Sequence, residues 1–348
     1  FNGVTAAAVP TPPPGEILYA TNGSSISRFS SSVLGSVTTV PITGMQVGET
    51  LIGMDLRPAT GVIYGVGSTS RVYIINPTTG AATPVGSAGA FAVNGTSFGM
   101  DFNGGVDRIR LVSNTEQNLR LNPNDGTLTA TDTALSPAGN IVGIAYDRND
   151  ATPITPTTLY GIDSAAGTLV TIGSIDGSPN SPNGGQVTTV GSLGLGTNLN
   201  ESIGFDVSAT SGISYATITT GGISRLYTIN LATGAATLVS SNGGAIGSGT
   251  TPFLSITSSA RPTAANVTVS GRVLNFGGAG IRGARITLTD EWGMTRVVMA
   301  NAFGYYKFED VAAGHSYTLS PASAKLRFSP RLIAVNDTLT DVNFTPEQ

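Results

Sequence analysis

The chain has 348 residues, of which 11% are charged and 40% are hydrophobic, and its formal net charge is −4. It contains no cysteine and a single histidine, which excludes disulfides, thiolate metal sites and cysteine nucleophiles. No basic stripe is present to release counterions from phosphates, so nucleic acid is not an expected partner. The length favours two domains, and the supply of Val, Ile and Leu excludes a disordered chain.

The first residue is Phe1, and no run of 18 apolar residues occurs anywhere in the sequence. We therefore expect a processed, secreted chain that has lost its signal peptide, works outside the cell and has no membrane span.

Residues 1–14 form the first segment, and they do not share the repeats that follow. Phe1 to Val9 is uncharged and suited to an extended conformation, and residues 10–14 are a proline-rich, stiff spacer. Such an arm either frays or adds as a strand to a neighbouring molecule. The positions that we expect to bind the partner are Phe1, Val4, Ala6, Ala8 and Val9.

Residues 15–260 contain a repeat. A glycine-centred strand recurs at intervals of 44 to about 60 residues, which is a propeller-blade period. Its copies are Leu51–Asp55, Ser97–Asp101, Ile141–Ala145 and Ser202–Asp206. Each copy is followed by further strands and by a turn of the Asn76–Gly80 kind, so each unit predicts four antiparallel strands.

The first unit, at residues 17–42, lacks its glycine-centred strand. A matching segment appears at the far end, Phe253 to Ile256. We predict that this segment completes the first unit and closes a five-bladed β-propeller that has no open edge.

The order of these motifs resembles the bacterial family called domain of unknown function 4394, across residues 15–260. The resemblance implies a secreted propeller without a known activity.

Three aspartates, Asp55, Asp101 and Asp206, recur at one position of the glycine-centred strands, where the copy at 141–145 has Ala145. If these strands face the channel, the carboxylates converge and have the chemistry to bind Ca²⁺ or to act as a glycosidase pair. The structural alternative, which we favour, is that each carboxylate bonds turn amides at the end of its own strand. We accordingly assign no metal, cofactor or catalytic residue.

Two segments interrupt the repeat, the acidic loop at 147–150 and the insertion at 176–185. Neither has the spacing of a Ca²⁺ loop. We expect surface loops, with ligand binding as the alternative.

After a linker at 261–263, residues 264–348 show short strands between glycine-rich turns, which predicts a sandwich of seven or eight strands. The Gly271–Val273 opening, Phe303–Phe308 and Ala313–Leu319 resemble the carboxypeptidase regulatory-like, transthyretin-like (Ig-like) family. That resemblance implies an accessory or interaction module without chemistry. His315 is expected in a turn or on the surface, and Trp292 is expected to pack in the sandwich.

The sequence thus favours an all-β, non-enzymatic extracellular structural protein. In this hypothesis copies join head to tail into a filament or surface appendage, through the arm of one and the sandwich of the next. The alternatives are a secreted adhesin that binds carbohydrate or surface glycans and a glycoside hydrolase that depends on carboxylates.

Overall fold

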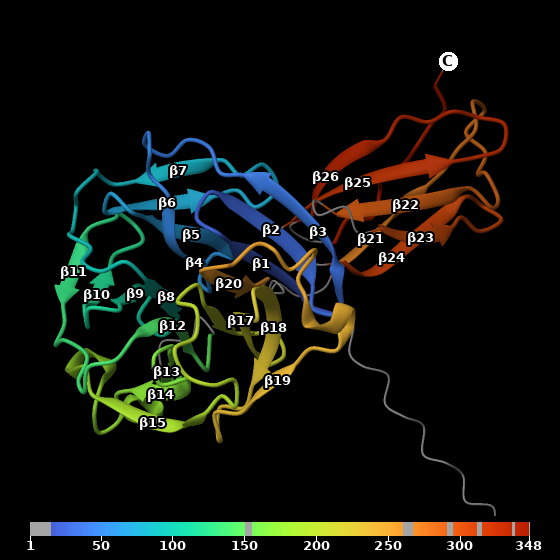
Figure 1. Ribbon diagram of the computed structural model, residues 1–348. Coiled ribbons are helices and arrows are strands. Elements are labelled where there is room, and N and C mark those ends of the chain that lie inside the picture. Colours follow the sequence, from blue (N-terminus) through green and yellow to red (C-terminus); the bar gives the residue numbers. More distant parts are fainter. Residues whose placement is uncertain are drawn as a thin grey trace, which may run out of the picture. The chain divides into compact units, whose positions relative to one another are not determined.

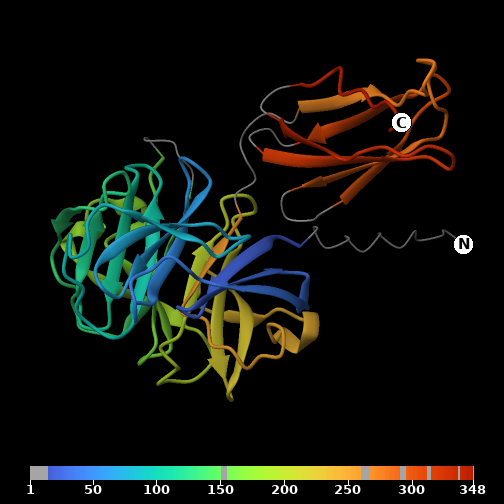
Figure 2. The same ribbon diagram turned by 90° about the horizontal axis from the view of Figure 1, so that it is seen from above.

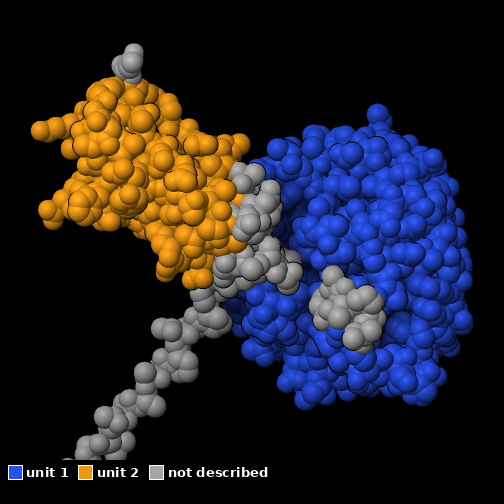
Figure 3. Space-filling model, turned by 180° about the vertical axis from the view of Figure 1, so that it is seen from behind, with its two compact units in different colours: residues 1–260 blue, residues 261–348 orange. Residues whose placement is uncertain are grey.

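A computed structural model describes residues 15–149, 155–259, 267–290, 295–311, 315–335 and 338–347. The chain divides into two compact units, residues 1–260 (unit 1) and residues 261–348 (unit 2), which Figure 3 colours separately. The regular secondary structure of the described residues is β-strand, apart from three short 3₁₀ turns. No helix in these ranges is long and apolar enough to cross a membrane.

The described part of unit 1 contains five antiparallel sheets of four strands each (Figure 1). The first comprises β20 (Ser255–Ser258), β1 (Ile17–Thr21), β2 (Ser25–Ser30) and β3 (Val33–Pro41). The second comprises β4 (Leu51–Arg57), β5 (Val62–Gly67), β6 (Arg71–Ile75) and β7 (Ala82–Val85). The third comprises β8 (Phe98–Asn103), β9 (Arg108–Ser113), β10 (Asn118–Leu121) and β11 (Leu128–Thr131).

The fourth sheet comprises β12 (Ile141–Tyr146), β13 (Leu159–Asp163), β14 (Thr168–Ile172) and β15 (Val187–Ser192). The fifth comprises β16 (Gly204–Val207), β17 (Ser214–Thr220), β18 (Ile223–Ile229) and β19 (Ala236–Leu238). The 3₁₀ turns are η1 (Ile175–Gly177), η2 (Pro182–Gly184) and η3 (Ser241–Gly244).

The inner strands β4, β8, β12, β16 and β20 contact one another in cyclic order, so they form a closed ring around which the sheets are arranged (Figures 1 and 2). The apolar core lies between neighbouring sheets. One cluster, for example, joins Val66 and Val72 of the second sheet to Phe102 and Leu111 of the third. Burial of these facing side chains is the main force that holds the sheets together.

The ring closes where the sequence predicts it. β20 pairs antiparallel with β1, with Leu18 opposite Ser258 and Thr21 opposite Ser255. This pairing confirms that a strand near Phe253 completes the N-terminal sheet, although the strand begins at Ser255. Because the first and last described strands of unit 1 share one sheet, its inner ring has no open edge.

Glycine in the inner strands reflects the close approach of neighbouring strands. A Cβ atom on Gly99 would lie 3.0 Å from the backbone nitrogen of Ile144, and one on Gly204 would lie 2.6 Å from that of Ile256. At Gly99 and Gly204 a larger residue would clash with the backbone of the next inner strand. In β20 the equivalent position is Ser255, whose hydroxyl donates to the carbonyl oxygen of Met54 at 2.6 Å.

The described part of unit 2 contains two antiparallel sheets over one core. The four-stranded sheet runs in the order β23 (Thr295–Met299), β22 (Arg285–Asp290), β25 (His315–Ala322), β26 (Arg331–Val335). The second sheet pairs β21 (Val267–Arg272) with β24 (Tyr305–Val311). Inward side chains of both sheets, among them Leu288, Phe308 and Leu319, form the core.

Two expectations for unit 2 need correction. The described residues form six strands, because the chain near Phe344 makes only isolated bridges with Val273 and its neighbours and not a full strand. Of the two expectations for His315, the turn is wrong, because the residue begins β25, opposite Val335. Trp292 lies outside the described residues.

Candidate functional site

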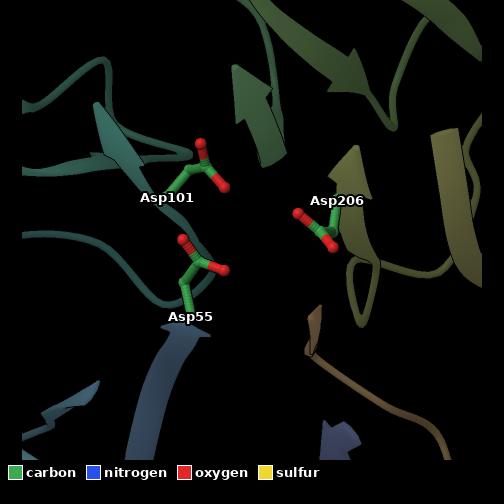
Figure 4. Close-up of side chains that lie close together, drawn as sticks. All are labelled: Asp55, Asp101 and Asp206. Atoms are coloured by element: carbon green, nitrogen blue, oxygen red, sulfur yellow. The ribbon is translucent and has the colours of Figure 1, made fainter. Parts of the chain in front are cut away.

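The ring of inner strands brings Asp55, Asp101 and Asp206 together, although they lie far apart in the sequence. Each is only 1% exposed. One carboxylate oxygen from each lies within 4.8 Å of the others, and Figure 4 shows the three carboxylates facing one another. The convergence anticipated from the repeat is therefore confirmed.

Strand geometry explains this convergence. Each aspartate follows the close-contact glycine by two residues, at the same position of β4, β8 and β16. Side chains two residues apart in a strand point to the same face. Equivalent positions of strands in a closed ring therefore direct their side chains toward the same central region.

Each carboxylate also links two inner strands. Asp55 Oδ2 accepts a hydrogen bond from the backbone N–H of Phe102 at 2.8 Å, and Asp101 Oδ2 accepts one from that of Tyr146 at 2.8 Å. Asp206 Oδ2 accepts from the backbone N–H of Ser258 at 2.6 Å. The structural role predicted for the aspartates thus exists, but the amides belong to the next inner strand and not to a turn of the same strand.

Thr257 occupies the equivalent position in β20 and was missed by the sequence analysis. Its Oγ1 accepts from the backbone N–H of Leu56 at 3.2 Å and donates to Asp55 Oδ1 at 2.8 Å. An alignment of Ser255–Ser258 with Gly204–Val207 would have revealed it. The fifth inner strand, β12, has Ala145 at this position. Alanine has no polar side chain, so the series of polar residues around the ring is interrupted there, as the sequence indicates.

Two oxygens of the cluster have no hydrogen-bond partner among the described residues. These atoms, Asp101 Oδ1 and Asp206 Oδ1, are buried. A buried carboxylate oxygen without a donor is costly unless a proton or a cation satisfies it. The cluster is therefore incompletely satisfied by the protein itself.

Burial raises the pKa of all three carboxyl groups. The pKa of Asp55 rises to about 8 because the group is desolvated and lies near the charge of Asp206. Desolvation raises the pKa of Asp206 to about 6, and desolvation with the charges of Asp55 and Asp206 raises that of Asp101 well above its ordinary value. The site resists holding three negative charges unless a positive charge balances them.

The acidic loop and the insertion that interrupt the repeat are joined to each other. Arg148 pairs with Asp147 at 3.2 Å and with Asp176. Asp147 Oδ1 also accepts from the backbone N–H of Thr158 at 2.8 Å. Asp150 lies outside the described residues. These acidic side chains are thus used in local contacts at the surface.

The end of the insertion is anchored to the third sheet. Asn183 Oδ1 accepts from Arg110 Nη2 at 2.6 Å, and the carbonyl oxygen of Pro182 accepts from Asn118 Nδ2 at 3.1 Å. The segment is therefore held as part of the framework of unit 1.

Arg110 belongs to a buried ionic network that the sequence did not reveal. Asp132 Oδ2 accepts from Arg110 Nη1 at 2.6 Å and from Arg120 Nε at 2.7 Å. Burial alone would raise the pKa of Asp132, but the two guanidinium groups outweigh burial and lower it. No sequence motif marks these residues, because they meet only through strand pairing and the turn after β11.

The residues expected to bind a partner, Phe1, Val4, Ala6, Ala8 and Val9, lie outside the described residues.

No curated protein matches the chain. Several solved structures overlap it loosely. A protein of unknown function from Bacteroides thetaiotaomicron VPI-5482 is 14% identical, with 65% of this chain and 58% of that chain covered and a TM-score of 0.39. The major pilin subunit of Bacillus cereus is 11% identical, with 39% of this chain and 38% of that chain covered and a TM-score of 0.21. Dihydro-heme d1 dehydrogenase NirN is 11% identical, with 99% of this chain and 66% of that chain covered and a TM-score of 0.32.

These overlaps are too weak to carry an argument about fold or function. The family comparison is different, because residues 25–251, more than half of the chain, match the family described as domain of unknown function (DUF4394). The chain belongs to the DUF4394 family.

Proposed function

We propose that unit 1 is a five-bladed β-propeller and that unit 2 is an immunoglobulin-like, transthyretin-like sandwich. The cyclic contacts of the inner strands and the pairing of β20 with β1 support the propeller, with each four-stranded sheet as one blade. The two antiparallel sheets of unit 2 and their common core support the sandwich.

On this framework we propose a non-enzymatic, extracellular structural protein, a subunit of a head-to-tail filament or surface appendage. The observation that carries the proposal is the outer edge of β26. In the described part of unit 2, β26 pairs only with β25, and Leu332 on β26 is 72% exposed. An exposed edge strand offers unpaired N–H and C=O groups to another chain.

β26 is a better acceptor than β23, the other edge of the same sheet. Arg296 of β23 donates through Nη1 to the carbonyl oxygen of Asp310 at 2.9 Å and through Nη2 to that of Glu309. These bonds bridge the edge of β23 to β24. A strand added at β23 would have to displace them.

The proposed donor is the arm Phe1–Val9 of a neighbouring copy. Val4, Ala6 and Ala8 share one face of an extended strand, and no proline interrupts the chain before Pro10. Nine extended residues span about 30 Å, which exceeds the length of the five-residue β26. Because donor and acceptor are different surfaces, the contact propagates as a chain of subunits.

The buried carboxylates weigh against the glycoside hydrolase alternative. A glycosidase pair flanks a sugar bond and must be reachable by the substrate. Asp55, Asp101 and Asp206 are each 1% exposed, and one oxygen of each is committed to a backbone amide. This geometry suits a framework better than a substrate site.

The direct test compares the full chain with a variant that lacks residues 1–14, by electron microscopy and sedimentation. We expect polymers of the full chain and monomers of the truncated chain. A matched pair keeps the length: Ala6→Pro removes a backbone donor from the arm, whereas Ala6→Thr keeps it. Identical polymers from the truncated chain would refute the proposal.

The acceptor edge is tested by disulfide trapping. Because the chain has no cysteine of its own, only the introduced cysteines can form disulfides. Oxidation of an Ala6→Cys, Leu332→Cys protein should give a ladder of covalent multimers that reductant removes. The control pairs Ala6→Cys with Val106→Cys, an exposed position of unit 1. A ladder in the control as strong as in the test protein would contradict β26 as the acceptor.

A further inference from the structure

We propose that Asp55, Asp101 and Asp206 bind a hard divalent cation at the centre of the inner-strand ring, with Ca²⁺ as the ion that fits. The site is separate from the assembly proposed above and is independent of it. Three observations lead to it: the spacing of the carboxylate oxygens, the buried oxygens without a hydrogen-bond donor, and the charge of the cluster.

The spacing fits one ion. Ca²⁺ binds oxygen ligands at about 2.3–2.6 Å, so ligands on opposite sides of it lie up to about 5 Å apart. The three carboxylate oxygens all lie within 4.8 Å of one another. Side chains that offer only oxygen favour Ca²⁺ or Mg²⁺ over zinc and other softer metals. Mg²⁺ demands a tighter, near-ideal octahedron at about 2.0–2.1 Å and dehydrates reluctantly, which fits a closed site less well.

The hydrogen bonds leave the oxygens that a cation needs. Backbone amides of Tyr146 and Ser258 hold the Oδ2 atoms of Asp101 and Asp206, whereas the buried Oδ1 atoms of both residues have no partner in the part of the chain that the structure describes. Figure 4 shows the three carboxylates directed toward a common central region. The amides therefore fix Asp101 and Asp206 and leave one oxygen of each available for coordination. Asp55 Oδ1 accepts one hydrogen bond, from Thr257 Oγ1, and keeps a second lone pair for an ion.

The charge of the cluster points the same way. The ion pairs of the described residues lie elsewhere, at Asp107, Asp132, Asp147, Asp176 and Glu309. No guanidinium or ammonium group among them balances the three buried carboxylates. Because buried charges are tolerated when they are paired or coordinate a metal, a divalent cation resolves the cost of burying this cluster.

A cation here would also join blades. Asp55, Asp101 and Asp206 come from three of the five inner strands. Coordination would tie these strands at the axis, in addition to the amide bonds between neighbours. Ala145 lies in β12, which stands between β8 and β16 in the ring. Because alanine has no polar side chain, it makes no side-chain hydrogen bond to the next inner strand. The ion would span this interruption through Asp101 and Asp206.

The test uses the full chain, purified without chelator and measured for bound metal by mass spectrometry. We expect about one Ca²⁺ per chain. After EDTA treatment and desalting, titration with CaCl₂ should raise the melting temperature of unit 1 by roughly 5–10 °C once Ca²⁺ reaches about 100 times Kd. Equimolar MgCl₂ should raise it much less.

Asp101→Asn and Asp206→Asn keep an oxygen for the amide of the next strand but remove the charge, so both should fold and lose the response to CaCl₂. Asp125→Asn, at an exposed turn of the same unit, should respond like the unchanged protein. If a variant does not fold, the metal content and CaCl₂ titration of the unchanged protein still decide. Absence of bound Ca²⁺ together with an unchanged melting temperature would overturn the proposal, and so would an unaltered response in both Asn variants.

Discussion

The carboxylate of Asp55 in β4 accepts a hydrogen bond from the backbone N–H of Phe102 in β8 at 2.8 Å, across 47 residues of sequence. The same bond joins Asp101 to Tyr146 and Asp206 to Ser258. A repeated aspartate therefore fixes β4 to β8, β8 to β12 and β16 to β20. The order of the sheets around the ring depends on these bonds as well as on apolar packing.

Replacing Asp55 by alanine should destabilise unit 1 by about 1–3 kcal/mol, because the buried N–H of Phe102 loses its acceptor. Asp55→Asn keeps an acceptor oxygen and should cost clearly less. Urea unfolding of both variants in the presence of EDTA measures the difference without a contribution from metal. Equal losses in the two variants would show that the hydrogen bond is not the source of the effect.

Gly204→Ala should destabilise the ring by about 1–3 kcal/mol or more through overpacking. The added Cβ atom would lie 2.6 Å from the backbone nitrogen of Ile256, and backbone cannot move aside as a flexible side chain can. Gly184→Ala is the matched control, since nothing lies within 4 Å of its Cβ position. Thermal unfolding compares the two, and a Gly204→Ala protein as stable as the control would contradict the close approach of β16 and β20.

Asp132→Asn should cost about 3 kcal/mol at neutral pH, because it leaves the buried guanidinium of Arg110 without its charge partner. The pKa of Asp132 is lowered in the folded protein from an ordinary value of 3.8. Its contribution to stability is therefore fully present above about pH 4, near the pKa of an unfolded aspartate, and is lost as pH falls through the folded-state pKa.

Urea unfolding at pH 7 and at pH 3 measures this contribution. The stability difference between the unchanged protein and Asp132→Asn should shrink at the lower pH. Asp125→Asn, at an exposed turn, controls for the loss of a carboxylate that accepts hydrogen bonds from Thr127 but forms no ion pair among the described residues. A difference that stays constant between the two pH values would contradict a role for the ionised carboxylate.

A chain that ends at residue 252 should aggregate, because the edge of β1 that pairs with β20 becomes exposed. A chain that ends at residue 259 keeps β20 and should remain monomeric with a cooperative unfolding transition. Size-exclusion chromatography and thermal unfolding compare the two. A well-folded, monomeric product from the shorter chain would contradict the role of β20 in closure.

Much of the architecture was predictable because local patterns repeat. The Gly53–Met54–Asp55 pattern and its copies define the inner strands, and Asn-Pro-x-x-Gly turns define the connections. Gly80 and Gly126 have φ of +74° and +72°, the left-handed conformation that such turns need from glycine. These requirements involve only a few consecutive residues, so they can be predicted from the sequence.

The side-chain network was only partly predictable. The shared position of the aspartates indicated that they converge, but the sequence does not show which amide each carboxylate meets, and so the turn interpretation was wrong. Thr257 and the pair Arg110–Asp132 depend on contacts between segments that the sequence separates. Such contacts follow from strand register and ring closure, which no short window of sequence contains.

The sequence by itself determined that this protein is all-β, that its first unit repeats, and that a late strand returns to the first sheet, because period, turn chemistry and close-contact glycines are local properties. Only the tertiary structure decided that three carboxylates meet at one buried point, where two of their oxygens have no donor among the described residues. The physical reason is that closure of the ring places equivalent positions of distant strands within a few ångströms of one another. Burial and mutual repulsion then act on the three carboxylates together and not on any one residue.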